Sequence, residues 1–192
     1  MEIVFVRHGQ TTWNAEDRLQ GQTDEPVLTE KGMEQIKLIG KELKNIEFDI
    51  IISSPLKRAI QTAEGIKPNS NIMIDNRLTE RSYGNFEGHY RSSNTYDIKQ
   101  LWNYGLEYKE EQVESVKILF DRVYDFLNEL IKKDYKRVLL VSHGGVSIAI
   151  RSYFEGFPVD MNLLSYNLDN GKFLFYDTEK IKNCSNKVGA ER

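Results

Sequence analysis

The stretch that decides the fold is Glu2 to Asn14, which reads EIVFVRHGQTTWN. Its apolar residues Ile3 to Val6 form a continuous run with β-branched side chains, typical of a strand buried on both faces of a parallel sheet. Arg7 and His8 follow at once, and Gly9 would let the backbone turn sharply close to a ligand. Since ligands in open α/β sheets bind beyond the carboxyl ends of the strands, we expect a functional edge here.

The same pattern, an apolar run that ends in polar and basic residues, occurs twice more. Residues 137–141 (RVLLV) lead into a segment with His143, and residues 49–52 (DIII) lead into a segment with Arg58. Together with the first stretch, these segments would bring two imidazoles and two guanidiniums to one sheet edge. The planar arginine side chain matches phosphoryl oxygens two at a time, so the pattern predicts a phosphoryl site.

Four motifs in this order carry a resemblance to a known family. They are RHGQTTWN (7–14), SSPLKRAIQTAE (53–64), LTERSYGNFEG (78–88) and VSHGG (141–145). RHG alone would be a weak signal, but the four together resemble the histidine phosphatase superfamily, the phosphoglycerate mutase-like group of phosphatases and mutases. The resemblance implies an α/β fold: a three-layer α/β/α sandwich around a mostly parallel sheet, with a small helical lid.

The composition is that of an ordinary soluble globular protein. The chain has 192 residues, of which 40% are hydrophobic and 29% charged, and we expect one domain over residues 1–192. A formal charge of -3 argues against nucleic-acid or acidic-membrane partners. The single Cys184 cannot form an internal disulfide, and no apolar run approaches the length of a membrane span. We therefore expect a cytoplasmic monomer or homodimer.

Apolar periodicity and turn residues place the remaining elements. A helix is expected from Thr29, with sheet-facing residues Met33, Ile36, Ile39 and Leu43. The sequence Asp169-Asn170-Gly171 between two apolar runs, 164–168 and 173–176, predicts a hairpin. The other expected elements are helices at 56–65, 113–133 and 145–154, a strand at 72–74, a lid at 85–110 and a polar tail at 179–192.

The residue types of the cluster predict covalent catalysis on a phosphomonoester. Neutral His8 would attack phosphorus through one ring nitrogen, while the other donates to a backbone carbonyl. Arg7, Arg58 and His143 would stabilise the charge on the phosphoryl oxygens. Glu80, which by itself would be an ordinary loop carboxylate, would protonate the leaving oxygen and then activate water. The resemblance implies the same assignments, residue by residue.

A zinc site is the main alternative for the two histidines, with His89 or Glu80 as a third ligand. A catalytic zinc usually has three protein ligands. Two arginines in the same cluster would oppose a dication, so we predict no metal and no cofactor. The sequence has no GxxxxGK[ST] loop, which argues against a nucleotide-dependent kinase.

The expected substrate is a small phosphorylated metabolite. Arg81 could reach a substrate carboxylate or a second phosphate. The other expected substrate contacts are Asn14, Gln20, Gly21, Tyr83 and Gly144.

The resemblance leaves the reaction open between hydrolysis and phosphoryl transfer. The chain is short where large phosphoglycerate mutases carry extra segments, which favours a phosphatase similar to α-ribazole or broad-specificity phosphatases. Glu80-Arg81 with Tyr83 is mutase-like. Val113-Glu114-Ser115 stands where many relatives have a GES-like segment, which leaves the lid contacts open. A catalytically silent phosphate-binding protein is a third alternative.

Overall fold

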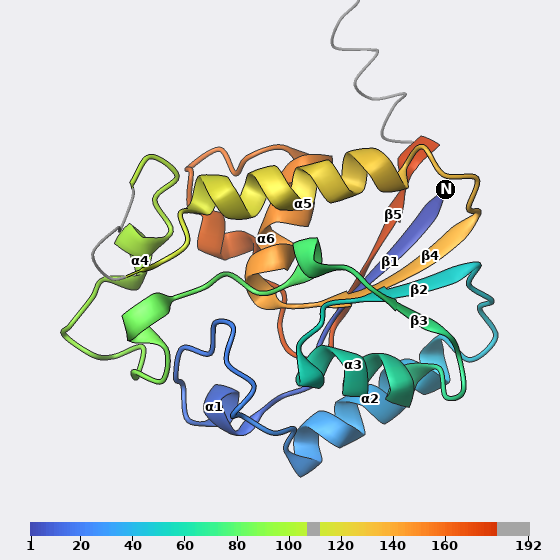
Figure 1. Cartoon of the computed structure of the whole chain (residues 1–192), viewed down its shortest axis with the longest axis horizontal. Coiled ribbons are helices and arrows are strands. Elements are labelled where there is room, and N and C mark those ends of the chain that lie inside the picture. The colour runs from blue at the N-terminus through green and yellow to red at the C-terminus, as the bar shows by residue number, and fades with distance from the viewer. Residues whose placement is uncertain (107–111, 180–192) are drawn as a thin grey trace, which may run out of the picture.

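A five-stranded sheet forms the centre of the computed structural model, which describes residues 1–106 and 112–179 (Figure 1). The strands are β1 Glu2–Arg7, β2 Ile50–Ser53, β3 Ile72–Ile74, β4 Arg137–Ser142 and β5 Phe173–Asp177. Their order is β3-β2-β4-β1-β5, and every neighbouring pair is parallel except β1 with β5. The four parallel strands match those predicted, to within one residue at each end.

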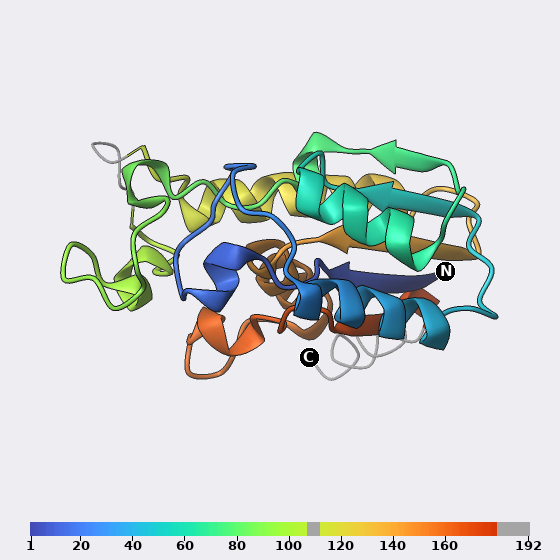
Figure 2. The same ribbon diagram turned by 90° about the horizontal axis from the view of Figure 1, so that it is seen from below.

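Helices cover both faces of this sheet. They are α1 Thr12–Ala15, α2 Glu30–Glu42, α3 Lys57–Ile66, α4 Ile98–Leu101, α5 Val116–Leu130 and α6 Gly144–Glu155, with 3-10 helices η1 Asn76–Leu78, η2 Gly84–Phe86 and η3 Leu163–Tyr166. Figure 1 shows α2 and α3 on one side and α5 with α6 on the other, and Figure 2 shows the same layers from below. The predicted three-layer sandwich is confirmed.

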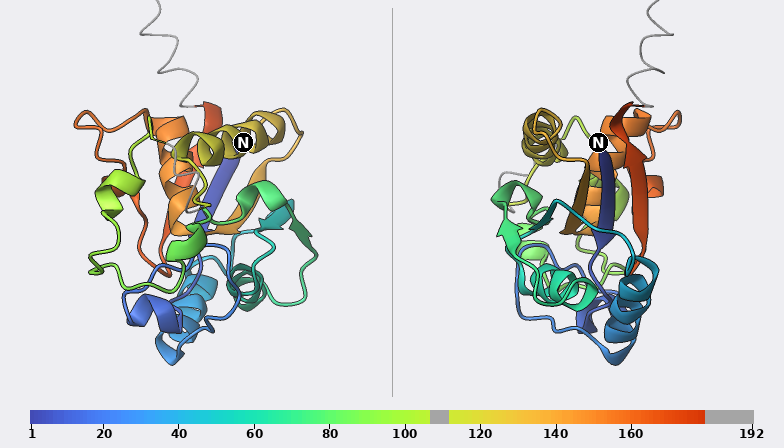
Figure 3. Two further views of the ribbon diagram at one scale, coloured as in Figure 1. Left: turned by 60° about the vertical axis from the view of Figure 1, so that its left-hand side comes forward. Right: turned by 90° about the vertical axis from the view of Figure 1, so that its right-hand side faces the viewer.

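The sequence of β1 explains why both faces are covered. Val4 and Val6 point toward α2 and α3, whereas Ile3 and Phe5 belong to the cluster formed with α5 and α6. All four side chains are fully buried. The right-hand panel of Figure 3, viewed from the amino-terminal end of β1, shows the sheet between the helices. Alternating side chains therefore enter two different cores, as expected for a central strand.

Helix α2 begins where predicted but presents a slightly different face. The Thr29 side chain caps it by accepting from the Gly32 amide at 3.1 Å. Ile36 packs on the sheet as expected, but Met33 is 56% exposed, so its predicted packing role is wrong. Gly32 takes the inward position of the first turn, because its backbone lies against that of Gln10 and leaves no room for a side chain there.

The predicted hairpin is also wrong. Residues 164–168 do not form a strand: most of them lie in η3, whose Leu163 packs into the core. The free edge of β1 is the actual partner of β5. Gly171 does adopt a turn conformation with φ of 65°, but its amide donates to the carbonyls of Arg7 and His8, at 3.3 and 3.2 Å. The turn therefore fastens β5 to the loop after β1.

Part of the predicted lid lies beyond the carboxyl ends of the parallel strands. Figure 1 shows η2 and α4 there, on the same side as α1. Leu101 and Trp102 are buried and anchor this segment. The following helix begins at Val116 rather than Val113, because the Ser115 side chain accepts from the amide of Ile118 and caps it.

Parts of other predictions fall on residues 107–111 and 180–192, outside the described residues. These include part of the lid, nearly all of the polar tail and Cys184. Within residues 1–106 and 112–179, no helix is long and apolar enough to cross a membrane.

Candidate active site

Three neighbouring strands deliver the central side chains of the site. β4 lies between β1 and β2, so the segments that follow these strands meet at one edge of the sheet. The rings of His8 and His143 lie edge to face, with centroids 5.1 Å apart and planes inclined by 60°. Arg58, in the first turn of α3, is buried with them. The structure thus brings together the residues that follow the three strands.

The tautomer of His8 follows from its backbone contact. Nδ1 lies 2.8 Å from the carbonyl oxygen of Gly9, and a carbonyl can only accept, so Nδ1 carries the proton. Burial lowers the pKa of His8 well below its usual value, and the charges of Arg58 and Arg7 lower it further. The imidazole is therefore neutral, and Nε2 keeps its lone pair.

Arg7 and Arg58 are held mainly by carbonyl oxygens. Arg7 Nη1 donates to the carbonyl of Leu168 at 2.6 Å, and Arg58 donates to those of Gly21 and Thr23 at 2.7 and 2.8 Å. Burial lowers the pKa of Arg7 to about 10, an effect that the charge of Glu80 opposes. Both side chains remain cations at neutral pH.

Three buried nitrogens of the cluster have no hydrogen-bond partner within the described part of the chain. They are Nε of Arg7, Nε of Arg58 and Nδ1 of His143. Buried polar atoms are nearly always paired in folded proteins, so these three nitrogens are available to form hydrogen bonds with a ligand. The other ring nitrogen of His143, Nε2, lies 2.7 Å from Oγ of Ser54. Burial lowers the pKa of His143, as do the charges of Arg58, His8 and Arg7.

Glu80 reaches the same region from the loop that follows η1. The amide of Gly145, in the first turn of α6, donates to both carboxylate oxygens at 3.1 Å. The amide of Arg81 donates to one of them at 2.8 Å. The side chain of Glu80 is almost fully buried. Its carboxylate is therefore fixed beside the start of α6, where the N–H groups of a helix have no intrahelical acceptor.

A small cavity of about 30 Å³ opens beside Arg7, His8 and Glu80, whereas Arg58 and His143 are buried next to it and do not line its wall. Its wall consists of Arg7, His8, Asn14, Gln20, Gly21, Glu80, Tyr83, Arg91, Trp102, Gly144, Gly145, Ile148, Leu164 and Asn167. The segment with η2 and α4 supplies Arg91 and Trp102.

The predicted substrate contacts separate into two groups. Those that line the cavity are Asn14, Gln20, Gly21, Tyr83 and Gly144. The structure does not bring Arg81 to the cavity wall. Its side chain is fully buried, its Nε donates to the carbonyl of Glu114 at 2.7 Å, and its guanidinium lies 4.9 Å from the ring centre of Trp102. Trp102 lines the cavity and Arg81 does not, so the predicted direct contact of Arg81 with substrate is not supported.

Sequence reasoning missed three polar residues at the site. Asn167 accepts from Arg7 at 3.4 Å, and Asn170 donates to the carbonyl of His8 at 3.2 Å. The hairpin predicted for this segment does not reveal a role for either residue. Arg91 lines the cavity and forms an ion pair with Asp17 at 3.4 Å. An arginine inside the predicted lid was the available signal for this residue.

A metal site finds no support among the described residues. Residues 1–106 and 112–179 contain no group of three or more histidine, cysteine or acidic side chains arranged to hold a metal ion. Nor does His89 approach the cluster as a third ligand: it stacks edge to face on Phe86, with ring centroids 6.3 Å apart.

Comparisons with known proteins agree on the family. A family model described as the histidine phosphatase superfamily (branch 1) matches residues 3–182. A Hydrogenobacter thermophilus protein provisionally named phosphoserine phosphatase 2 is 32% identical over 174 residues, covering 88% of this chain and 85% of the relative. The probable phosphoglycerate mutase GpmB of Salmonella choleraesuis is 36% identical over 165 residues, covering 82% and 76%.

A solved structure supports the fold. A mycobacterial glucosyl-3-phosphoglycerate phosphatase in complex with VO3 superposes with a TM-score of 0.79 at 25% sequence identity. The match covers 92% of each chain. The set of similar proteins thus contains both phosphatases and a mutase, the two activities that the sequence left open.

Proposed function

This chain belongs to the histidine phosphatase superfamily, and we propose that it hydrolyses small phosphomonoesters through a phosphohistidine on His8. The tautomer of His8 carries this proposal. Because Nδ1 donates to the Gly9 carbonyl, Nε2 is the nitrogen available to phosphorus, and the neutral state of the ring preserves its lone pair.

In the first step Nε2 of His8 attacks phosphorus. The N–P bond forms, the bond from phosphorus to the ester oxygen breaks, and the proton of a neutral Glu80 passes to the leaving alkoxide. In the second step Glu80 takes a proton from water, whose oxygen attacks phosphorus as the N–P bond breaks. Inorganic phosphate leaves and the starting enzyme is restored.

The positive charge for this reaction comes from side chains. Arg7 and Arg58 would bind the phosphoryl oxygens, and their unpaired Nε groups support such a contact. His143 and the amide of Gly144 would add neutral donors. Removal of one preorganised donor typically lowers the rate by about 10²–10³. The cationic character of this donor set favours an anion over a dication, so we propose a mechanism that uses no metal.

The proposed substrate is an alkyl phosphate on a small metabolite. The similar proteins are named for phosphoserine and for compounds related to phosphoglycerate, in which the phosphate is carried by a small acid. Arg91 at the cavity wall, rather than Arg81, would then face the second anionic group. We favour hydrolysis over mutase activity, because in the two-step scheme above water is the only acceptor that the phosphoryl group needs.

The test is a panel of phosphorylated metabolites that includes phosphoserine, 3-phosphoglycerate and α-ribazole phosphate. We expect phosphate release from at least one of them, and an acid-labile phosphoenzyme that disappears in His8→Ala. Conversion of 3-phosphoglycerate to 2-phosphoglycerate without phosphate release would establish a mutase instead. Binding of inorganic phosphate with no turnover of any ester would indicate a silent binding protein.

A further inference from the structure

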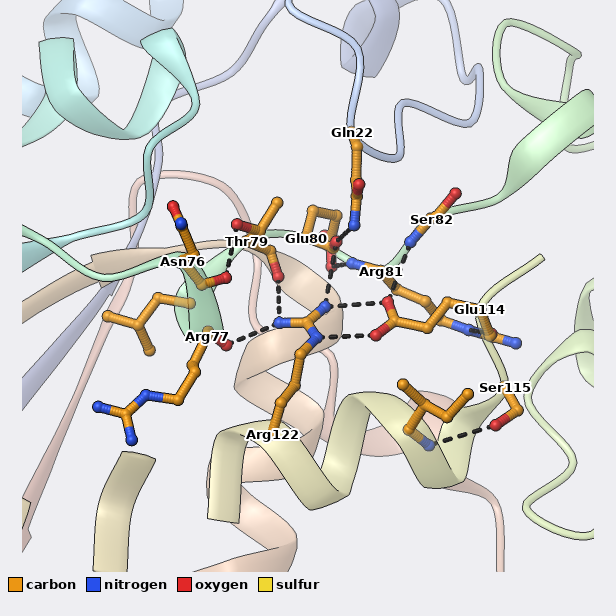
Figure 4. Close-up of polar contacts among 12 residues, drawn as sticks. Gln22, Asn76, Arg77, Thr79, Glu80, Arg81, Ser82, Glu114, Ser115 and Arg122 are labelled. Atoms are coloured by element: carbon orange, nitrogen blue, oxygen red, sulfur yellow. Dashed lines mark hydrogen bonds and ion pairs between the residues drawn. The ribbon is translucent and has the colours of Figure 1, made fainter. Parts of the chain in front are cut away.

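Arg122, on α5, binds the backbone of the loop that carries Glu80 (Figure 4). Its Nη1 donates to the carbonyls of Arg77 and Thr79, at 2.6 and 2.7 Å. Its Nη2 donates to the carbonyl of Glu80 at 3.2 Å. Three carbonyls from a stretch of four residues thus converge on one guanidinium.

The carboxylate of Glu114 occupies the rest of the same guanidinium. Nε of Arg122 donates to Oε1 at 2.7 Å, and Nη2 donates to Oε2 at 2.9 Å. An arginine has five N–H donors in a rigid plane, and all five of Arg122 are therefore used. Both side chains are largely buried, with 19% and 11% of their surfaces exposed. This fixed plane defines where the backbone at Glu80 can lie.

The backbone on the other side of Glu80 is fastened to the same group. The amide of Ser82 donates to Oε2 of Glu114 at 3.2 Å, and Nε of Arg81 donates to the carbonyl of Glu114 at 2.7 Å. The loop therefore meets the Arg122–Glu114 pair both before and after the catalytic candidate. Val113-Glu114-Ser115 differs from a GES-like segment at its first residue and retains the glutamate, Glu114.

Glu80 is consequently held at both ends. Nε2 of Gln22 also donates to its backbone carbonyl, at 2.9 Å, in addition to Arg122. Its carboxylate is held by the amides of Gly145 and Arg81. Two of the five donors of Arg122 are sufficient for the ion pair with Glu114. The other three bind backbone carbonyls at or near Glu80, which links this ion pair to the proposed acid.

We propose that Arg122 is a positioning residue that sets the place of the Glu80 carboxylate for proton transfer to the leaving oxygen. This inference rests on the proposed function, because it assigns Glu80 the role of acid. A misplacement of about 1 Å can cost about 10² in rate, so a guanidinium that fixes the loop has a measurable effect without contact with substrate.

The variant for the test is Arg122→Lys. Lysine keeps the positive charge, which matters because Arg122 is one of the smaller causes of the lowered pKa of His143, after burial and the charges of Arg58, His8 and Arg7. It has three donors on one nitrogen and cannot reproduce the planar fork.

Arg77→Lys is the matched control. Arg77 lies in η1, just before this loop, and its side chain pairs with Asp75, Asp125 and Glu129 instead of with the carbonyl of Glu80. The loss of a fork at this position should therefore leave proton transfer unchanged.

The first measurement is single-turnover phosphorylation with an alkyl phosphate and with 4-nitrophenyl phosphate, whose leaving group needs little protonation. For Arg122→Lys we expect a loss on the order of 10² with the alkyl ester and a much smaller loss with the nitrophenyl ester. Addition of Glu80→Gln to Arg122→Lys should cost no more than Glu80→Gln alone. Equal losses for the two esters, or additive losses in the double variant, would overturn the proposal.

The second measurement needs no turnover. The Gly145 amide resonance reports its hydrogen bond to Glu80, and it should shift in Arg122→Lys and in Glu80→Gln but not in Arg77→Lys. An unchanged resonance in Arg122→Lys would overturn the positioning role.

If the wild-type protein hydrolysed neither ester, the proposed function would fail, and this resonance would still decide whether Arg122 places Glu80. If Arg122→Lys failed to fold, Glu114→Gln, which loosens the same guanidinium, would replace it in both measurements.

Discussion

His8 and His143 form a pair of buried imidazoles whose ring centroids lie 5.1 Å apart, on segments that follow neighbouring parallel strands. Burial is the largest cause of the lowered pKa of each ring, and the charges of Arg58 and Arg7 act in the same direction. Two neutral histidines beside two guanidinium cations can accept a dianion without a further gain of protons. The same arrangement makes the folded state sensitive to acid.

Stability should fall as the pH drops below about 6.5, the usual pKa of histidine. In the unfolded chain His8 and His143 bind protons near that pH, whereas in the folded chain their lowered pKa keeps them neutral. The unfolded state thus binds more protons, so each residue lowers stability by up to about 1.4 kcal/mol per pH unit in this window. Urea unfolding at pH 7.5, 6.5 and 5.5 would measure the slope, and a His8→Asn/His143→Asn variant should show a shallower one. Parallel pH dependences for the two proteins would contradict this explanation.

Chelators should leave activity intact. The proposed charge stabilisation comes from Arg7 and Arg58, whose guanidiniums remain protonated throughout the neutral range. Phosphate release in the presence of excess EDTA should therefore match the untreated rate. Loss of activity with EDTA and its recovery with zinc would require a metal mechanism in place of ours.

The sequence predicted the strand ends that carry His8, His143 and Arg58, because continuous apolar runs followed by polar residues identify central strands of a parallel sheet. Their convergence then followed from sheet geometry, and the structure brings them together. The order of the strands required the structure, since an apolar run does not specify its neighbour.

Other features depended on contacts that no local pattern records. Arg81 packs on Trp102, which lines the cavity while Arg81 does not, and the two residues are too far apart in sequence for a local pattern to reveal the contact. The sequence Asp169-Asn170-Gly171 is typical of a hairpin turn, but the partner of β5 is β1, more than 160 residues earlier in the chain. Local turn preferences could not reveal that pairing.

Gly145→Ala should impair the proposed acid although alanine favours a helix by about 1 kcal/mol over glycine. A methyl group at this position would collide with Oε1 of Glu80 and approach the Trp102 ring to 3.2 Å. We expect a large loss with alkyl phosphates and retained thermal stability. Gly105→Ala is the control, because among residues 1–106 and 112–179 its methyl group would meet only the Asn103 side chain, at 3.6 Å. Unchanged turnover of alkyl phosphates by Gly145→Ala would show that Glu80 tolerates displacement.

Glu87→Gln should weaken substrate binding without a change in leaving-group preference. The carboxylate of Glu87 accepts from the amides of Gln22, Thr23 and Tyr83, at 3.0 to 3.1 Å. The Gln22–Thr23 segment in turn helps to hold Arg58, which donates to the carbonyl of Thr23. Loss of one acceptor should therefore raise KM for alkyl and nitrophenyl esters by a similar factor. A selective loss with the alkyl ester would instead identify Glu87 as the acid.

The last prediction concerns Glu80 itself. Its carboxylate stands beside a cluster built for anions, where it cannot bind phosphate, so its presence there is explained by proton transfer. If Glu80 protonates the leaving oxygen, Glu80→Gln should slow an alkyl phosphate most, because an alkoxide is a poor leaving group without a proton. General acid catalysis typically contributes about 10²–10⁴-fold, and we expect a loss of that order. A nitrophenyl phosphate leaves as a stable phenolate and should lose markedly less.

The comparison requires single-turnover kinetics of the phosphorylation step. Glu80 would also activate water in the second step, so a steady-state rate limited by dephosphorylation would show similar losses for both esters and hide the difference. In the first step alone, the ratio of the two rate constants isolates the proton that reaches the leaving oxygen, since both esters form the same phosphohistidine on His8. Equal losses in that step would mean that Glu80 is not the acid, while a defect confined to the second step would leave it only the role of activating water.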